Sequence, residues 1–164
     1  MSLYNFSFGS NMSSHRLLAR LPNAKRIGTA VLQGYELTFD MYFKDGSGKC
    51  SISPSDAEDA LVYGVVYQIS DAEKVILDGI EGAGYDCVNI TVKLLSGEDV
   101  NAHCYIANTH DSEALPYDWY IKHVHRGALE AGVPKAYSDA ILNRAQKSDS
   151  NLERAEIEFA VHQK

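Results

Sequence analysis

The chain is organised around one stretch near its start, Tyr4-Asn5-Phe6-Ser7-Phe8-Gly9-Ser10-Asn11-Met12. The first half of the stretch alternates aromatic and polar residues, which is the period of a half-buried β-strand. Leucines at helical spacing follow over residues 17–21, and Ser13 or Ser14 can cap that helix. The stretch Gly9-Ser10-Asn11 is therefore predicted to be a turn that joins the end of a strand to the start of a helix.

This turn has the features of a site for negative charge. Glycine lets the backbone approach another group closely, because it carries no side chain. Backbone N–H groups at the start of a helix point outward and attract anions. The turn therefore predicts an anion or oxyanion site, although an ordinary tight turn with a helix cap is built from the same residue types.

The composition bounds the class of protein. The chain has 164 residues, of which 45% are hydrophobic and 23% charged, as in soluble globular proteins. One domain over residues 1–164 is the default at this length, and it can bury a full core. The net charge of −7 argues against nucleic-acid binding, which needs a basic surface. Because no apolar run is long enough to span a bilayer and no signal-peptide pattern is present, we expect no membrane partner and a cytoplasmic location.

The cysteines and histidines form no disulfide or metal-binding pattern. Cys50, Cys87 and Cys104 are odd in number and lack CxxC spacing, so we expect three reduced thiols in the core. His123 and His125 lie two residues apart and would not share a helix face, which argues against a metal site.

The rest of the chain predicts strands in its middle and helices in its last third. A capping box at Ser70 and Glu73 starts a short helix that should end at Glu81-Gly82. Strands are expected within residues 24–43, at 60–69 with both faces covered, and in a hairpin of 85–95 with 100–107; helices are expected at 118–131, 134–146 and 151–162. Strands joined mostly by short turns suggest an antiparallel or mixed barrel.

Glu81 is unusually placed for a carboxylate. It falls at a helix C-terminus, where it faces the negative end of the helix dipole, and glycines flank it at positions 82 and 84. If the apolar strands also bury it, its proton is held more tightly. Such a group suits the transfer of a proton near neutral pH, although a surface glutamate that ends a helix is the plainer interpretation.

Several motifs taken together resemble the γ-glutamylcyclotransferase family, also called AIG2-like. They are Phe8-Gly9-Ser10-Asn11, Gly64-Val65-Val66-Tyr67, Leu77-Asp78-Gly79-Ile80-Glu81-Gly82, the segment 120–128 that ends in Gly127-Ala128, and Gly132-Val133-Pro134 followed by Tyr137. Their order and spacing cover roughly residues 4–142. One departure is that Phe8 replaces the family's usual tyrosine, and its effect depends on whether the turn acts through its backbone or through the missing hydroxyl.

The resemblance implies an α+β fold, a small mixed β-barrel with flanking helices. It also implies a reaction in which the α-amine of a γ-glutamyl compound attacks its own γ-carbonyl, giving 5-oxoproline and a free amine or amino acid. Glu81 would be the general acid and base, Phe8, Gly9, Ser10 and Asn11 would hold the substrate, and Tyr85 and Tyr120 would line the pocket. No metal or cofactor is implied, and a homodimer is possible.

Two other functions remain open at this point. One is a γ-glutamylamine cyclotransferase that acts on γ-glutamyl-lysine-type amines, and the other is a catalytically silent module of the same fold that binds small acids. Arg16 could pair with a substrate carboxylate, but a solvated helix arginine is the preferred interpretation, and Asp78 is likewise expected to be solvated.

Overall fold

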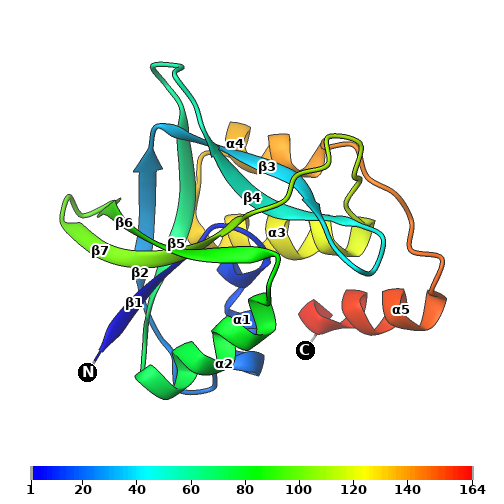
Figure 1. Cartoon of the computed structure of the whole chain (residues 1–164), viewed down its shortest axis with the longest axis horizontal. Helices are drawn as coiled ribbons and strands as arrows, with labels where there is room; N and C mark the ends of the chain where they lie inside the picture. The colour runs from blue at the N-terminus through cyan, green and yellow to red at the C-terminus, as the bar shows by residue number, and fades with distance from the viewer. Residues whose placement is uncertain (1, 164) are drawn as a thin grey trace.

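A closed barrel of five strands forms the centre of the molecule in the computed structural model, which describes residues 2–163. Residues 1 and 164, the ends of the predicted domain, lie outside the described residues. The strand order is β1 (Leu3–Ser7), β5 (Leu61–Ile69), β2 (Lys25–Gln33), β6 (Tyr85–Leu94) and β7 (Asp99–Ala107). β1 and β7 close the barrel in parallel and the other pairs are antiparallel (Figure 1). The predicted mixed barrel with flanking helices is confirmed.

The most apolar run of the chain lies between two barrel neighbours. β5 pairs with β1 on one side and β2 on the other, and most of its residues are buried, as predicted. Gly28 lies at a bulge in β2, and Gly34, with φ of 83°, turns the chain out of the barrel. β3 (Tyr35–Tyr42) then pairs with β4 (Gly48–Pro54) in a separate two-stranded sheet.

The helices begin and end close to the predicted positions. α1 (Ser14–Arg20) is capped by Ser13, and a short 3₁₀ turn, η1 (Ser10–Met12), precedes it. α2 (Asp71–Glu81) has the predicted capping box. α3 (Asp118–Ala131) is as predicted, α4 (Lys135–Leu142) is shorter than predicted, and α5 (Leu152–Ala160) leads into η2 (Val161–Gln163). No helix among the described residues is long and apolar enough to cross a membrane.

Two predictions about exposure are wrong. The polar face of β1 is not solvated, because Asn5 and Ser7 are 2% and 7% exposed and border a cavity. Cys87 is exposed on β6, whereas Cys50 and Cys104 are buried as predicted, and all three thiols are free. The polar side chains of β1 therefore border the cavity rather than bulk water, and Phe6 borders the same cavity.

Candidate active site

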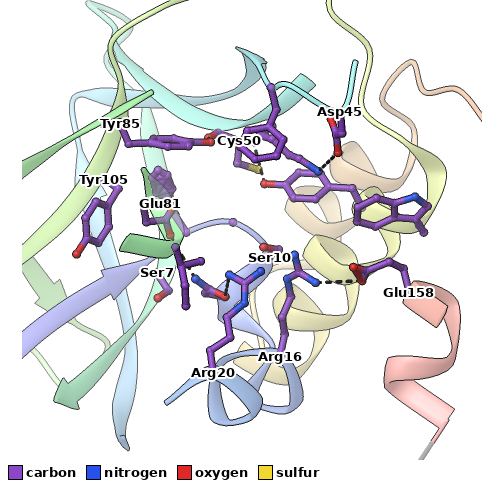
Figure 2. Close-up of a pocket in the computed structure, with 18 of the residues that line it drawn as sticks. Ser7, Ser10, Arg16, Arg20, Asp45, Cys50, Glu81, Tyr85, Tyr105 and Glu158 are labelled. Carbon is purple, nitrogen blue, oxygen red and sulfur yellow. Dashed lines mark hydrogen bonds and ion pairs between the residues drawn. The ribbon is translucent and has the colours of Figure 1, made fainter. Parts of the chain in front are cut away.

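A cavity of about 530 Å³ lies between the end of β1, the start of α1, the β3–β4 sheet and the ends of α2 and α5. It is lined by every residue that the sequence assigns to the site, namely Phe8, Gly9, Ser10, Asn11, Glu81, Tyr85 and Tyr120. Figure 2 shows Ser10, Glu81 and Tyr85 around the same space. The fold thus brings together segments that are far apart in the sequence.

The turn after β1 offers backbone donors to this cavity. η1 is a 3₁₀ turn rather than the direct start of an α-helix that the sequence predicts. Its carbonyls are used, because Met12 N–H donates to Gly9 and Ser13 N–H donates to Ser10. Within the described part of the chain, the N–H groups of Gly9, Ser10 and Asn11 have no acceptor. These unpaired donors can hold a carboxylate or an oxyanion.

Two glycines allow the turn to lie where it does. A Cβ at Gly9 would come within 2.9 Å of the Cβ of Cys50 on β4, so only glycine fits there without a shift. A Cβ at Gly127 on α3 would lie 2.6 Å from both Met12 Cβ and Ser13 N. The turn is therefore held between β4 on one side and α3 on the other.

Glu81 is the last residue of α2, and the chain leaves the helix through Gly82 with φ of 74°. Asn11 Nδ2 donates to Glu81 Oε1 at 3.5 Å, so the carboxylate lies beside the turn. Burial raises the pKa of Glu81, and the positive charges of Arg20 and Arg16 partly oppose that rise. The group can therefore accept and return a proton closer to neutral pH than an ordinary glutamate.

The hydroxyls of the two predicted tyrosines form hydrogen bonds with the backbone of β4. The N–H of Cys50 donates to the Tyr120 hydroxyl at 3.0 Å, and the Tyr85 hydroxyl donates to the Cys50 carbonyl at 2.8 Å. Burial raises the pKa of the Cys50 thiol to about 12, so the thiol is neutral and a poor nucleophile. Tyr85 and Tyr120 thus shape the cavity wall, and the Tyr85 proton is already committed to the Cys50 carbonyl.

Comparison with known proteins shows which family this chain resembles. The model of the AIG2-like family matches residues 61–141, which hold β5, Glu81, the β6–β7 hairpin and α3. The γ-glutamylcyclotransferases of mouse and human are each 27% identical to this chain, over 146 and 150 residues; the alignments cover 83% and 85% of this chain and 75% and 77% of theirs. A solved structure titled γ-glutamyl cyclotransferase superposes with a TM-score of 0.82 at 25% identity, covering 94% of this chain and 97% of its own. Together these matches support membership of the γ-glutamylcyclotransferase/AIG2-like family.

The cavity also has a second side that the sequence does not predict. The charged wall consists of Asp45, Lys49, Arg154 and Glu158, from the β3–β4 sheet and α5. Lys49 Nζ lies 3.2 Å from Asp45 and 4.5 and 4.4 Å from the ring centres of Trp119 and Tyr120. Burial lowers the pKa of Lys49, and the charge of Asp45 opposes that effect.

Arg16 joins α1 to the charged wall, and its predicted solvation is wrong. Its side chain is 13% exposed, and Nη1 lies 3.2 Å from Glu158 Oε2 (Figure 2). Glu158 also lies 2.8 Å from His123 Nε2, and His123 Nδ1 lies 2.8 Å from His162 Nε2. A neutral His123 can donate to Glu158 and accept from His162. The spacing of Arg16 and Arg20, one helical turn apart beside the Gly9 turn, could have indicated that both face the cavity.

Asp78 is not the solvated helix residue that the sequence predicts. Asp78 pairs with Lys74 at 2.9 Å, and it accepts a hydrogen bond from the hydroxyl of Tyr105, which lines the cavity. Asp78 is therefore coupled to the cavity wall and not merely solvated. Among residues 2–163, no group of three or more metal-ligating side chains could hold a metal ion.

Proposed function

We propose that this chain is an enzyme that cyclises the γ-glutamyl group of γ-glutamyl amino acids to 5-oxoproline and releases the amino acid. The observation that carries the proposal is the meeting of Glu81 with the unpaired N–H groups of the Gly9 turn in one cavity. The names of the mouse and human relatives support the same general reaction at low identity.

The proposed steps use groups that the cavity contains. Glu81 takes a proton from the substrate's α-ammonium, and the free amine attacks the γ-carbonyl carbon. The N–H groups of Gly9, Ser10 and Asn11 lie where they can stabilise the oxyanion or hold the substrate's carboxylate. The first proton passes to solvent, and Glu81 then takes the second proton from the attacking nitrogen and delivers it to the leaving nitrogen as the C–N bond breaks. A cavity that holds the substrate folded back on itself supplies the proximity that a flexible chain lacks.

The charge of the cavity supports an acidic substrate. Five cationic side chains and three carboxylates line it, although the whole chain has a net charge of −7. They are Arg16, Arg20, Lys44, Lys49 and Arg154, with Asp45, Glu81 and Glu158. Because the charged wall includes the cations Lys49 and Arg154, it fits the carboxylate that an amino-acid leaving group carries and that a simple amine lacks. This argument favours γ-glutamyl amino acids over γ-glutamylamines.

The proposal is tested by incubating the protein with a panel of γ-glutamyl dipeptides and γ-glutamylamines and assaying 5-oxoproline. We expect product from the dipeptides at higher kcat/KM than from the amines. Faster release from γ-glutamyl-lysine-type amines would make the chain a γ-glutamylamine cyclotransferase. No product from any compound, combined with measurable binding of 5-oxoproline, would make it a silent binding module.

The broader expectations from the sequence stay part of the proposal. We propose that residues 1–164 act as one domain, that the protein works in the cytoplasm, and that its partner is a small γ-glutamyl molecule rather than a nucleic acid or a membrane. A homodimer is compatible with these expectations.

A further inference from the structure

Arg20 is a partly buried cation without a direct ion-pair partner among the described residues. Its Nη1 donates to the Asn11 amide oxygen at 3.2 Å, and no carboxylate among the described residues forms an ion pair with it. By contrast, three of the four other cations that line the cavity have a carboxylate partner, and the fourth, Lys44, is exposed. Arg16 pairs with Glu158, Lys49 with Asp45, and Arg154 with Asp149. The charges of Glu81 and Glu158 act on Arg20 only through space, and a partly buried guanidinium without a direct carboxylate contact is suited to an anion from outside.

Asn11 stands between this cation and the proposed base. Its amide oxygen accepts from Arg20, and its amide nitrogen donates to Glu81 Oε1 at 3.5 Å. A carboxylate at this position would neutralise Arg20, whereas a neutral amide orients the guanidinium and leaves its charge free. Each polar atom of the Asn11 side chain thus has one partner in the site, which makes Asn11 a positioning residue for both Arg20 and Glu81.

We propose that Arg20 binds the α-carboxylate of the γ-glutamyl group. This inference rests on the proposed function and names the residue that holds one end of its substrate. One amide group spans the gap between Arg20 and Glu81, and an α-amino acid carries its carboxylate and its ammonium on a single carbon. A carboxylate on Arg20 therefore places the α-ammonium toward Glu81, which must deprotonate it. The planar guanidinium has further N–H donors for a bidentate contact, and the unpaired N–H groups of the Gly9 turn lie beside it.

Binding at Arg20 has a consequence for the base. The charge of Arg20 is the largest influence that lowers the pKa of Glu81, followed by that of Arg16. A substrate carboxylate that neutralises Arg20 removes much of this influence, so Glu81 becomes a stronger base when substrate is present. The same contact thus positions the amine and prepares its proton acceptor.

The direct test compares two ligands that differ only in charge, 5-oxoproline and its carboxamide, by calorimetry. We expect the wild-type protein to bind the acid about 10–100-fold more tightly, as for hydrogen bonds to a charged group. Arg20→Gln should abolish this preference and leave carboxamide binding unchanged. Arg20→Lys should keep part of it, because it keeps the charge but loses the fork of donors. Arg126→Gln, which removes an exposed arginine of α3, is the matched control and should retain the full preference.

A pH profile of turnover tests the role of Asn11. Arg20→Gln should move the acid limb of kcat/KM to higher pH, because a charge that lowers the pKa of Glu81 is gone. Asn11→Ala should move that limb to lower pH, because Arg20 can then approach Glu81 directly. A residue with only a structural role would lower activity in both variants without shifting the limb in opposite directions.

The outcomes separate this proposal from the proposed function. Binding of 5-oxoproline through Arg20 without turnover of any γ-glutamyl compound would keep the carboxylate site and reject the activity. Turnover by an Arg20→Gln protein that still prefers the acid would keep the activity and reject Arg20 as the receptor. Equal binding of acid and carboxamide by the wild-type protein, or no binding of either, would overturn the Arg20 proposal even if no variant folds.

Discussion

The cavity has two walls of different construction. The turn wall consists of residues 8–20 with Glu81, and its parts are held by backbone contacts through Gly9 and Gly127. The charged wall consists of Asp45, Lys49, Arg154 and Glu158, and it is held largely by ion pairs. Its helix α5 has no buried residue. The turn wall leaves a cation and three N–H groups unpaired, whereas every cation of the charged wall has a carboxylate partner.

This difference predicts a division of labour. Groups that perform chemistry must be held rigidly, and they must keep charges and hydrogen-bond donors unpaired for the substrate. The turn wall meets both conditions. Paired side chains on a helix with little buried surface can adapt to different leaving groups, which describes the charged wall. Changes in the turn wall should therefore lower kcat, and changes in the charged wall should mainly raise KM.

The largest effect is expected from Glu81→Gln. Glutamine keeps the shape of the side chain but cannot accept a proton at neutral pH, so kcat should fall about 10²–10⁴-fold in the 5-oxoproline assay. The melting temperature should rise slightly. Because the folded state holds the Glu81 proton more tightly than the unfolded state, the ionised carboxylate destabilises the fold at pH 7.

Glu58→Gln is the control for this change, because Glu58 is an exposed carboxylate away from the cavity. It should leave turnover unchanged. Asp78→Asn is a poor control, since Asp78 bonds to Tyr105 of the cavity. A fully active Glu81→Gln protein would reject both the proposed base and the division between the walls.

The next effect in size is expected from Gly9→Ala. The new Cβ would lie 2.9 Å from Cys50 Cβ, so the turn or β4 must move, at a cost of about 1–3 kcal/mol in unfolding free energy. Activity should fall more than stability implies, because the displaced N–H groups no longer meet the substrate. Gly79→Ala is the matched control. Its Cβ meets nothing within 4 Å on the exposed side of α2, so it should stabilise the protein by roughly 0.5–1 kcal/mol.

The two walls also differ in how far the sequence predicts them. The strand, the Gly9 turn and the end of α2 at Glu81 were predicted because each has a local signature of alternation, capping or glycine placement. The ion pair of Arg16 with Glu158 joins residues 142 apart in sequence, and no local pattern reports it. Without partners, Arg16 and Lys49 resemble ordinary surface cations. The barrel was predictable in type, but the side chains that the β3–β4 sheet and α5 bring to it were not.

A smaller effect is expected from Glu158→Gln. Loss of the ion pair to Arg16 and of the charged acceptor for His123 should raise KM about fivefold, the equivalent of an ion pair worth about 1 kcal/mol, with kcat nearly unchanged. Glu156→Gln on the same helix is the matched control, because Glu156 is exposed and does not line the cavity. A drop in kcat without a change in KM would move Glu158 into the reacting part of the site.

The smallest effect is a loss of stability of the charged wall at low pH. It is measured by thermal unfolding at pH values between 7 and 4. Burial lowers the pKa of His123, and burial with the nearby charge of His123 lowers that of His162 to about 4. Below pH about 6.5 the unfolded chain therefore binds more protons at these histidines than the folded chain does, so stability falls as the pH falls.

Glu158 extends the same loss to lower pH. Burial alone would raise its pKa, but the hydrogen bond from His123 and the charge of Arg16 outweigh burial and hold the pKa at about 2. Its contribution is present above its unfolded pKa of about 4.3 and is lost as the pH falls toward 2. His162→Gln should flatten the melting-temperature profile between pH 6.5 and 4 and leave the profile below pH 4 unchanged, because Glu158 remains. A profile that His162→Gln does not alter would mean that α5 is held by its packing rather than by this network, and the contrast between the two walls would fail.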